Sequence, residues 1–177
     1  MRQLASWLAA LVLASASAAG AVPSCRLAEP AVEAVIAAKA TELRGTEYCQ
    51  FRNYNTLDEV DGDGTDDFIV LFTVDGIEDG GNDHADFMAV WLSGRGDAAP
   101  LVVQTGARGE RDPVGISVRD RRIHLRTLEY RPSDPMCCPS GKGEVVYELK
   151  DGALRPAPQP AARGKPRRKG AATGGTR

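Results

Sequence analysis

Basic residues are missing from a long central part of the sequence, because no Lys or Arg occurs from Asn53 to Gly94. The same part of the chain is rich in acids, with eleven Asp and Glu from Asp58 to Asp86. The segment from Ala157 to Arg177 has the opposite composition, with six Lys and Arg and no Asp or Glu. The formal net charge of −2 therefore hides a segregation of charge. A dense acidic segment repels itself unless a counter-charge is present, so this segment favours a bound cation.

Signatures of familiar enzymes are also missing. The sequence has no nucleophile-elbow serine, no HExxH pair and no phosphate-binding loop. It has only two histidines, His84 and His124, and its adjacent cysteines lack the usual spacing of zinc ligands. These absences favour a non-enzymatic role, with a metal- or cysteine-dependent hydrolase or redox protein as the alternative.

The two ends of the chain differ from the part between them. Residues 1–21 combine Arg2, an apolar run and small residues, which predicts a secretory signal too short to span a bilayer. An uncleaved anchor and a lipoprotein lipidated at Cys25 are the alternatives. Residues 157–177 predict a disordered basic tail, which either aids solubility or contacts an anionic envelope component. Residues 22–156 are left as a single globular domain, with 15 basic and 24 acidic residues and a net charge of −9.

The domain between the ends predicts an α+β fold. A helix is expected from Pro30 to about Leu43, with Pro30 suited to its first turn. Strand-like segments follow, and no helix of 10–15 residues separates the later ones, so parallel crossovers are not expected. We therefore predict an N-terminal helix packed on a mostly antiparallel, meandering sheet, with strands near 48–54, 68–74, 87–92, 101–103, 114–118, 123–130 and 145–149.

One acidic loop has the spacing of a calcium site. Counted from Glu59, carboxylates stand at positions 1, 3, 5 and 9, and a glycine stands at position 6. Such a loop wraps a hard cation with side chains and one backbone carbonyl, and Ca²⁺ accepts the six to eight oxygens on offer. An EF-hand is excluded because position 12 is Val70 and a strand follows. The predicted ligands are Glu59, Asp61, Asp63, Thr65 (through its carbonyl) and Asp67.

This loop resembles the calcium loops of FG-GAP and VCBS-type repeats, Asp-x-Asp-x-Asp-Gly-x-x-Asp, with Glu59 replacing the first Asp. Those repeats build propellers, but this chain has one loop and no internal repeat, so that fold is not expected. Over residues 54–150 the order of features also resembles a group of secreted bacterial proteins without assigned activity. Their late Asp-x-x-Cys-Cys-Pro-Ser/Thr is present here at 134–140. This resemblance implies an exported compartment and a shared scaffold, not a reaction.

A second acidic loop, residues 75–86, lies between two apolar strands. A strand of seven residues advances about 23 Å, so this loop is expected at the far end of the sheet from the first. It is therefore not expected to complete the first site, although it can hold a second, weaker cation. By the same geometry the connection 93–98 is expected to return to the first loop.

The four cysteines, Cys25, Cys49, Cys137 and Cys138, form an even set, which in an exported protein indicates disulfides. Three pairings are possible. The first pairing joins Cys137 to Cys138 and Cys25 to Cys49, and we lean towards it. In the other two pairings, Cys137 and Cys138 each form a disulfide with Cys25 or Cys49. The sequence therefore predicts an exported, periplasmic or secreted protein with structural Ca²⁺ and a binding or envelope-maintenance role, and without a specific nucleic-acid partner.

Overall fold

The computed structural model describes residues 29–78, 80–96 and 98–158. The predicted signal 1–21, Cys25 and all but the first two residues of the basic tail lie outside these ranges. The elements in chain order are α1 (Pro30–Glu42), β1 (Thr46–Glu47), η1 (Cys49–Phe51), β2 (Asn53–Asp58), β3 (Asp67–Asp75), β4 (His84–Trp91), η2 (Ser93–Arg95), β5 (Leu101–Ala107), β6 (Arg111–Arg119), β7 (Arg122–Glu129), β8 (Gly141–Lys150) and β9 (Ala153–Pro156).

The strands form one antiparallel sheet, and the class is mixed α+β with mostly β-structure. Every pairing is antiparallel, in the order β1-β3-β4-β5-β6-β7-β8-β9, with β2 also pairing with β3. From β3 onward each strand pairs with the next along the chain, so the predicted meander is confirmed. The segment 48–54, expected as one strand, is interrupted by η1. No helix within the described ranges is long and apolar enough to span a membrane.

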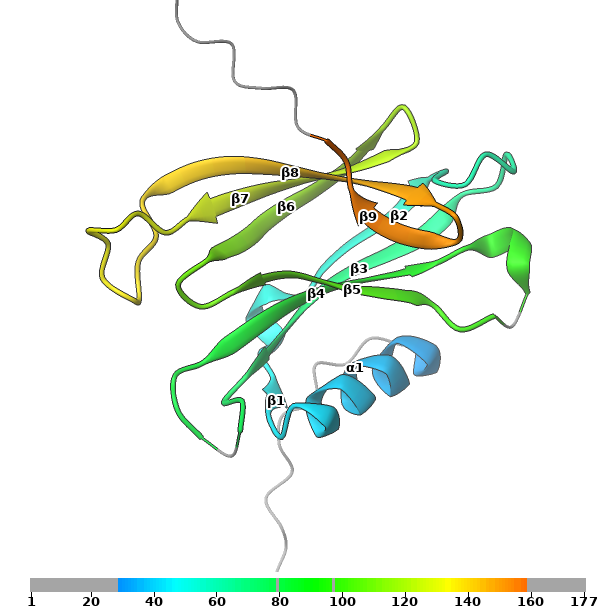
Figure 1. Ribbon diagram of the computed structural model, residues 1–177. Coiled ribbons are helices and arrows are strands. Elements are labelled where there is room, and N and C mark those ends of the chain that lie inside the picture. The colour runs from blue at the N-terminus through cyan, green and yellow to red at the C-terminus, as the bar shows by residue number, and fades with distance from the viewer. Residues whose placement is uncertain (1–28, 79, 97, 159–177) are drawn as a thin grey trace, which may run out of the picture.

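A weak seam divides the sheet between β5 and β6, which share the single pair Ala107↔Arg111. At this seam the chain bends, and Figure 1 shows β6, β7 and β8 on the other side of a gap from β3, β4 and β5. Side chains of both halves meet there in one buried cluster, which contains Ile69 and Met88 from the first half and Ile123 and Leu125 from the second. The inner face of each half is therefore apolar.

The central strands β3 and β4 are apolar on both faces, which explains their continuous hydrophobic runs. Alternate side chains of a strand point to opposite faces, so Ile69 and Leu71 belong to the cluster between the two halves. The intervening Val70 and Phe72 belong to a second buried cluster, together with Val32 and Ile36 of α1, Val74, Ala85, Phe87 and Ala89.

Two tight turns close hairpins in the second half of the sheet. Asp120 and Arg121 connect β6 to β7 with φ values of 52° and 57°, and Asp151 and Gly152 connect β8 to β9 with 52° and 75°. Positive φ at both central residues is the geometry that matches the twist of an antiparallel hairpin. These turns place β7 beside β6 and β9 beside β8.

Candidate functional site

The predicted calcium loop, residues 59–67, curls at the start of β3. The backbone N–H of Asp63 donates to Asp61 Oδ1 at 3.2 Å, and that of Thr65 donates to Asp63 Oδ1 at 2.8 Å. Gly62 and Gly64 have φ values of 92° and 83°, which glycine adopts without strain. The loop therefore turns where the sequence predicts the turn.

Asp67 has a role that sequence analysis missed. It is 1% exposed, and its two carboxylate oxygens accept the backbone N–H groups of Val60 at 2.8 Å and Ser93 at 3.0 Å. Asp67 thus holds the beginning of the loop and the end of β4 together. The Ser93 contact also confirms that the connection after β4 returns to this loop, although its Asp97 lies outside the described residues.

Arginines from elsewhere in the chain supply part of the counter-charge that the acidic segment lacks. Arg95 Nε lies 3.8 Å from Asp61 Oδ2, and the Arg121 guanidinium lies against Gly62. In the described parts of the chain, the acids of loop 59–67 form no group of three whose ligand atoms all lie within 4.8 Å of one another. Glu59 Oε1 is buried without a hydrogen-bond partner, so the loop keeps one free acceptor. Calcium binding here stays a prediction.

A pocket of about 630 Å³ lies at the other end of β3 and β4, where the second acidic loop was expected to be. It opens between the two halves of the sheet, beside the seam. Its apolar wall includes Tyr48, Phe51, Val114, Leu128, Tyr130 and Met136. Its polar groups include His84, Asp86 and Asp112, and the Cys137–Cys138 disulfide also lines it. A concave, largely apolar cavity with a few convergent polar groups is the usual form of a ligand site.

His84, Asp86 and Asp112 meet in this pocket although they lie on different strands. His84 and Asp86 are two residues apart on β4, so both point into the space between the sheet halves, as Met88 does. Asp112 comes from β6, across the seam. His84 Nε2 is 3.1 Å from Asp112 Oδ1 and 3.9 Å from Asp86 Oδ2. All three ligand atoms lie within 4.8 Å of one another, so this group can hold a metal ion.

Asp86 is a buried carboxylate with one oxygen left over. The residue is 5% exposed; its Oδ1 accepts the Thr73 hydroxyl, and its Oδ2 is buried without a hydrogen-bond partner. Burial raises the pKa of Asp86 to about 6, against the opposing hydrogen bond from Thr73. Gly106 faces it on β5, and a Cβ at that position would lie 2.9 Å from Oδ2. The missing side chain at Gly106 leaves room for this oxygen.

The neighbouring imidazole responds to the same acids. The hydrogen bond to Asp112 raises the pKa of His84 more than burial lowers it, and the negative charges of Asp86, Asp112 and Asp75 add to the increase. A proton on His84 therefore sits between carboxylates, at a place where a positive charge is stabilised.

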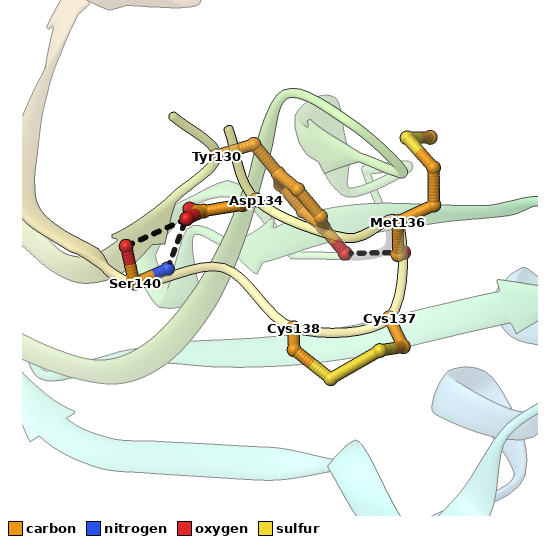
Figure 2. Close-up of a disulfide and its surroundings, with 6 residues drawn as sticks. All are labelled: Tyr130, Asp134, Met136, Cys137, Cys138 and Ser140. Carbon is orange, nitrogen blue, oxygen red and sulfur yellow. Dashed lines mark hydrogen bonds between the residues drawn. A yellow bond between two sulfur atoms is a disulfide. The ribbon is translucent and has the colours of Figure 1, made fainter. Parts of the chain in front are cut away.

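The disulfide loop, residues 131–140, contributes Met136, Cys137, Cys138 and Pro139 to the pocket wall. Figure 2 shows the disulfide and the hydrogen bonds around it. Asp134 shapes the loop, because its Oδ2 accepts the N–H groups of Arg131 at 2.9 Å and Ser140 at 2.8 Å, and its Oδ1 accepts the Ser140 hydroxyl at 2.8 Å. The Tyr130 hydroxyl donates to the carbonyl oxygen of Met136 at 3.0 Å. These bonds hold the loop on the side of the pocket.

Cys137 and Cys138 form a disulfide with each other in this loop. Of the three pairings considered from the sequence, the structure therefore has the one that joins these two neighbours. Cys49 is not a free thiol. Cys25, the partner that the sequence favours for it, lies outside the described residues. The Cys25–Cys49 bond therefore stays a prediction.

The second acidic loop lies where the sequence predicts it, whereas the group of three residues beside it was not predicted. Asp75 of β3 pairs with His84 of β4 at the end of the hairpin opposite Asp67, so the second loop does not complete the first site. The sequence did not identify His84 as a metal ligand, because its partner Asp112 is 28 residues away in the chain. The two residues come together only because the chain bends at the seam. The sequence does contain one indication of the site. His84 and Asp86 are polar residues at alternate positions of an otherwise apolar strand, so they share one face of the sheet.

Comparisons with known proteins add no family to this picture. No family model, curated protein or solved structure matches the chain. The chemistry of the pocket and of loop 59–67 is therefore interpreted from the residues that form them.

Proposed function

We propose that this protein is exported to the periplasm or the exterior and acts there as a binding domain without enzymatic activity. In this proposal loop 59–67 holds a structural Ca²⁺, and the pocket at the opposite end of β3 and β4 is the binding site. The two sites have separate tasks, since the first stabilises the connection between β2 and β3 and the second contacts the ligand.

The observation that carries this proposal is the free carboxylate oxygen of Asp86. A buried acceptor without a partner costs about 1–3 kcal/mol, and more if it is charged. In native proteins such an acceptor is usually satisfied by a water or an ion, or it has a functional role. Asp86 lies beside an apolar wall that includes Tyr130 and Met136, so the pocket suits a small molecule with an apolar body and one polar group that reaches the acids.

Export is supported by the signal-like residues 1–21 and by the Cys137–Cys138 disulfide, because disulfides persist mainly in oxidising compartments. The six basic residues of 157–177 supply positive charge for a contact with an anionic component of the envelope. That segment lies almost wholly outside the described residues, so this partner rests on composition alone.

Filling the pocket tests the binding role. Val114 lines the pocket on β6 and is 41% exposed, so Val114→Trp adds a large side chain to the cavity with little effect on the core. Val102, at 39% exposed on β5, does not line the pocket and provides the matched control Val102→Trp. We expect native mass spectrometry of the protein isolated from its exporting host to show an adduct on the wild type and on Val102→Trp, and at least a tenfold loss of it on Val114→Trp. A wild type without any adduct, or an adduct equal in both variants, contradicts the proposal.

One observation favours a second candidate, a redox protein. The Cys137–Cys138 disulfide borders the same pocket, and its reduction would take up two electrons and two protons to give two thiols facing the bound ligand. Its reduction potential separates the two functions. We expect a value below about −300 mV, which is typical of structural disulfides, whereas a value near −270 to −120 mV, typical of thiol–disulfide oxidoreductases, would favour the redox protein over the binding domain.

A further inference from the structure

We propose that His84, Asp86 and Asp112 bind a divalent transition-metal ion of the zinc class, whose remaining coordination positions face the pocket. This site goes beyond the proposed binding role and is separate from loop 59–67, which lies at the opposite end of β3 and β4. From Asp67 to Asp75 the strand advances about 26 Å.

The spacing of the three ligand atoms suits such an ion. Zinc is held at about 2.0–2.2 Å by nitrogen and oxygen, so two ligands of a tetrahedral ion lie about 3.3 Å apart. His84 Nε2 is 3.1 Å from Asp112 Oδ1 and 3.9 Å from Asp86 Oδ2, and these distances bracket that value. The ion therefore needs movements of less than about 1 Å in these two contacts, which side-chain rotation supplies.

Asp86 has the features of a metal ligand. Its Oδ2 is buried, points into the pocket group and has no hydrogen-bond partner. The Thr73 hydroxyl binds the other oxygen and fixes the orientation of the carboxylate. This arrangement resembles an outer shell, in which a hydrogen bond to one oxygen positions the other on the metal. A bound ion would remove the cost of the unpartnered acceptor.

The donor set selects the class of metal. One imidazole and two carboxylates suit Zn²⁺ and its first-row neighbours, whereas Ca²⁺ prefers six to eight oxygens. The charge around the pocket is also favourable, since Asp75 is a third acid on its wall and the nearby Arg108 is paired with Asp83 at 3.4 Å. The mixed nitrogen and oxygen donors of the pocket thus differ from the all-oxygen donors of loop 59–67.

Three protein ligands leave at least one position of a tetrahedral ion open. In this pocket the open side faces the cavity, because the side chains of His84 and Asp112 are 22% and 28% exposed and line it. If the pocket binds a small molecule, as proposed above, that molecule would carry an oxygen or nitrogen atom that completes the coordination of the ion. This last step rests on the proposed function, while the metal site itself does not.

Calorimetry with zinc chloride tests the site on untagged, EDTA-treated, oxidised protein that is kept in excess Ca²⁺ to saturate loop 59–67. We expect one equivalent of Zn²⁺ to bind, and we expect His84→Gln and Asp112→Asn each to weaken binding at least about 100-fold. His124→Gln is the matched control. His124 Nδ1 lies 3.2 Å from Glu144 Oε1 on the surface, so it is another imidazole beside a carboxylate, but outside the pocket. This control should leave zinc binding unchanged.

The absorption spectrum of bound Co²⁺ identifies the ligands of the metal independently of the affinity. Co²⁺ in place of Zn²⁺ should give visible ligand-field bands that disappear in Asp112→Asn, and Cys137→Ser with Cys138→Ser should keep them, because no thiolate is a ligand. Asp112 is partly exposed, so its variant stays informative if Asp86→Asn fails to fold. The proposal is overturned if the wild type binds no Zn²⁺, or if Asp112→Asn binds it as tightly as His124→Gln does. Neither outcome depends on the adduct measured with Val114→Trp.

Discussion

Arg52→Ala is expected to lower the free energy of unfolding by about 3–5 kcal/mol, because it removes the cation that pairs with the partly buried Glu47 and that also contacts Glu33. The Arg52 side chain is 4% exposed. Its Nη1 donates to Glu33 Oε1 at 2.7 Å, and its Nε and Nη2 donate to the two oxygens of Glu47. Burial lowers the pKa of Arg52, but the hydrogen bonds to Glu47 and Glu33 outweigh it and raise the pKa. Arg52 is therefore charged at every ordinary pH.

Urea unfolding of oxidised protein measures this effect. Arg119→Ala is the control, because Arg119 Nη2 lies 2.8 Å from Glu144 Oε1 but its side chain is 60% exposed. Exposed pairs contribute up to about 1 kcal/mol, so the control should change little. Arg52→Lys should fall between the two, since an ammonium keeps the charge but lacks the planar fork that reaches both glutamates. Equal losses in Arg52→Ala and Arg119→Ala would show that Arg52 does not join α1 to β1.

Calcium is expected to raise the melting temperature through loop 59–67. A ligand at 100 times its dissociation constant stabilises the native state by about 2.7 kcal/mol, which for a domain of this size corresponds to about 10 °C. Asp61→Ala with Asp63→Ala should abolish the rise. Glu78→Ala with Asp83→Ala removes the same charge from the second acidic loop and should preserve the rise. A melt that ignores both Ca²⁺ and EDTA would refute the calcium site.

Asp67 is a poor choice for testing calcium, because the structure assigns it a second task. Asp67→Ala leaves the N–H groups of Val60 and Ser93 without acceptors, at about 1–3 kcal/mol each. Its loss of stability should therefore appear with and without Ca²⁺. The exposed neighbour Asp66 provides the comparison, and Asp66→Ala should be nearly neutral in EDTA. The choice of Asp61 and Asp63 above avoids this confusion.

Much of the fold follows from local patterns in the sequence. Pro30 predicts the start of α1, and the apolar runs after Asp67 and after His84 predict the two central strands. The bend at Ala107 and Arg111 does not follow from such patterns, because it is a tertiary choice that lets two apolar faces pack. Without the bend the sheet would expose Ile123 and Leu125.

The candidate site was predictable only in part for the same reason. Loop 59–67 is contiguous, so its spacing could be interpreted directly, and its turns are where the sequence places them. The pocket joins His84 to Asp112 and to Cys137 through the bend, and no local spacing encodes that meeting. The counter-charge for the acidic loop likewise comes from distant residues, because Arg95 and Arg121 reach it from outside the segment that lacks basic residues.

The meander also has a consequence for how quickly the chain can fold. From β3 to β9 each strand pairs with the one that follows it, so most backbone pairings close short loops. Short loops cost little chain entropy, and sheets with such local contacts reach the native state faster than sandwiches built from distant strands. The turns at 120–121 and 151–152 favour early hairpins, while β1 and β2 must wait for β3. During synthesis, β1 and β2 therefore stay unpaired until β3 has been made.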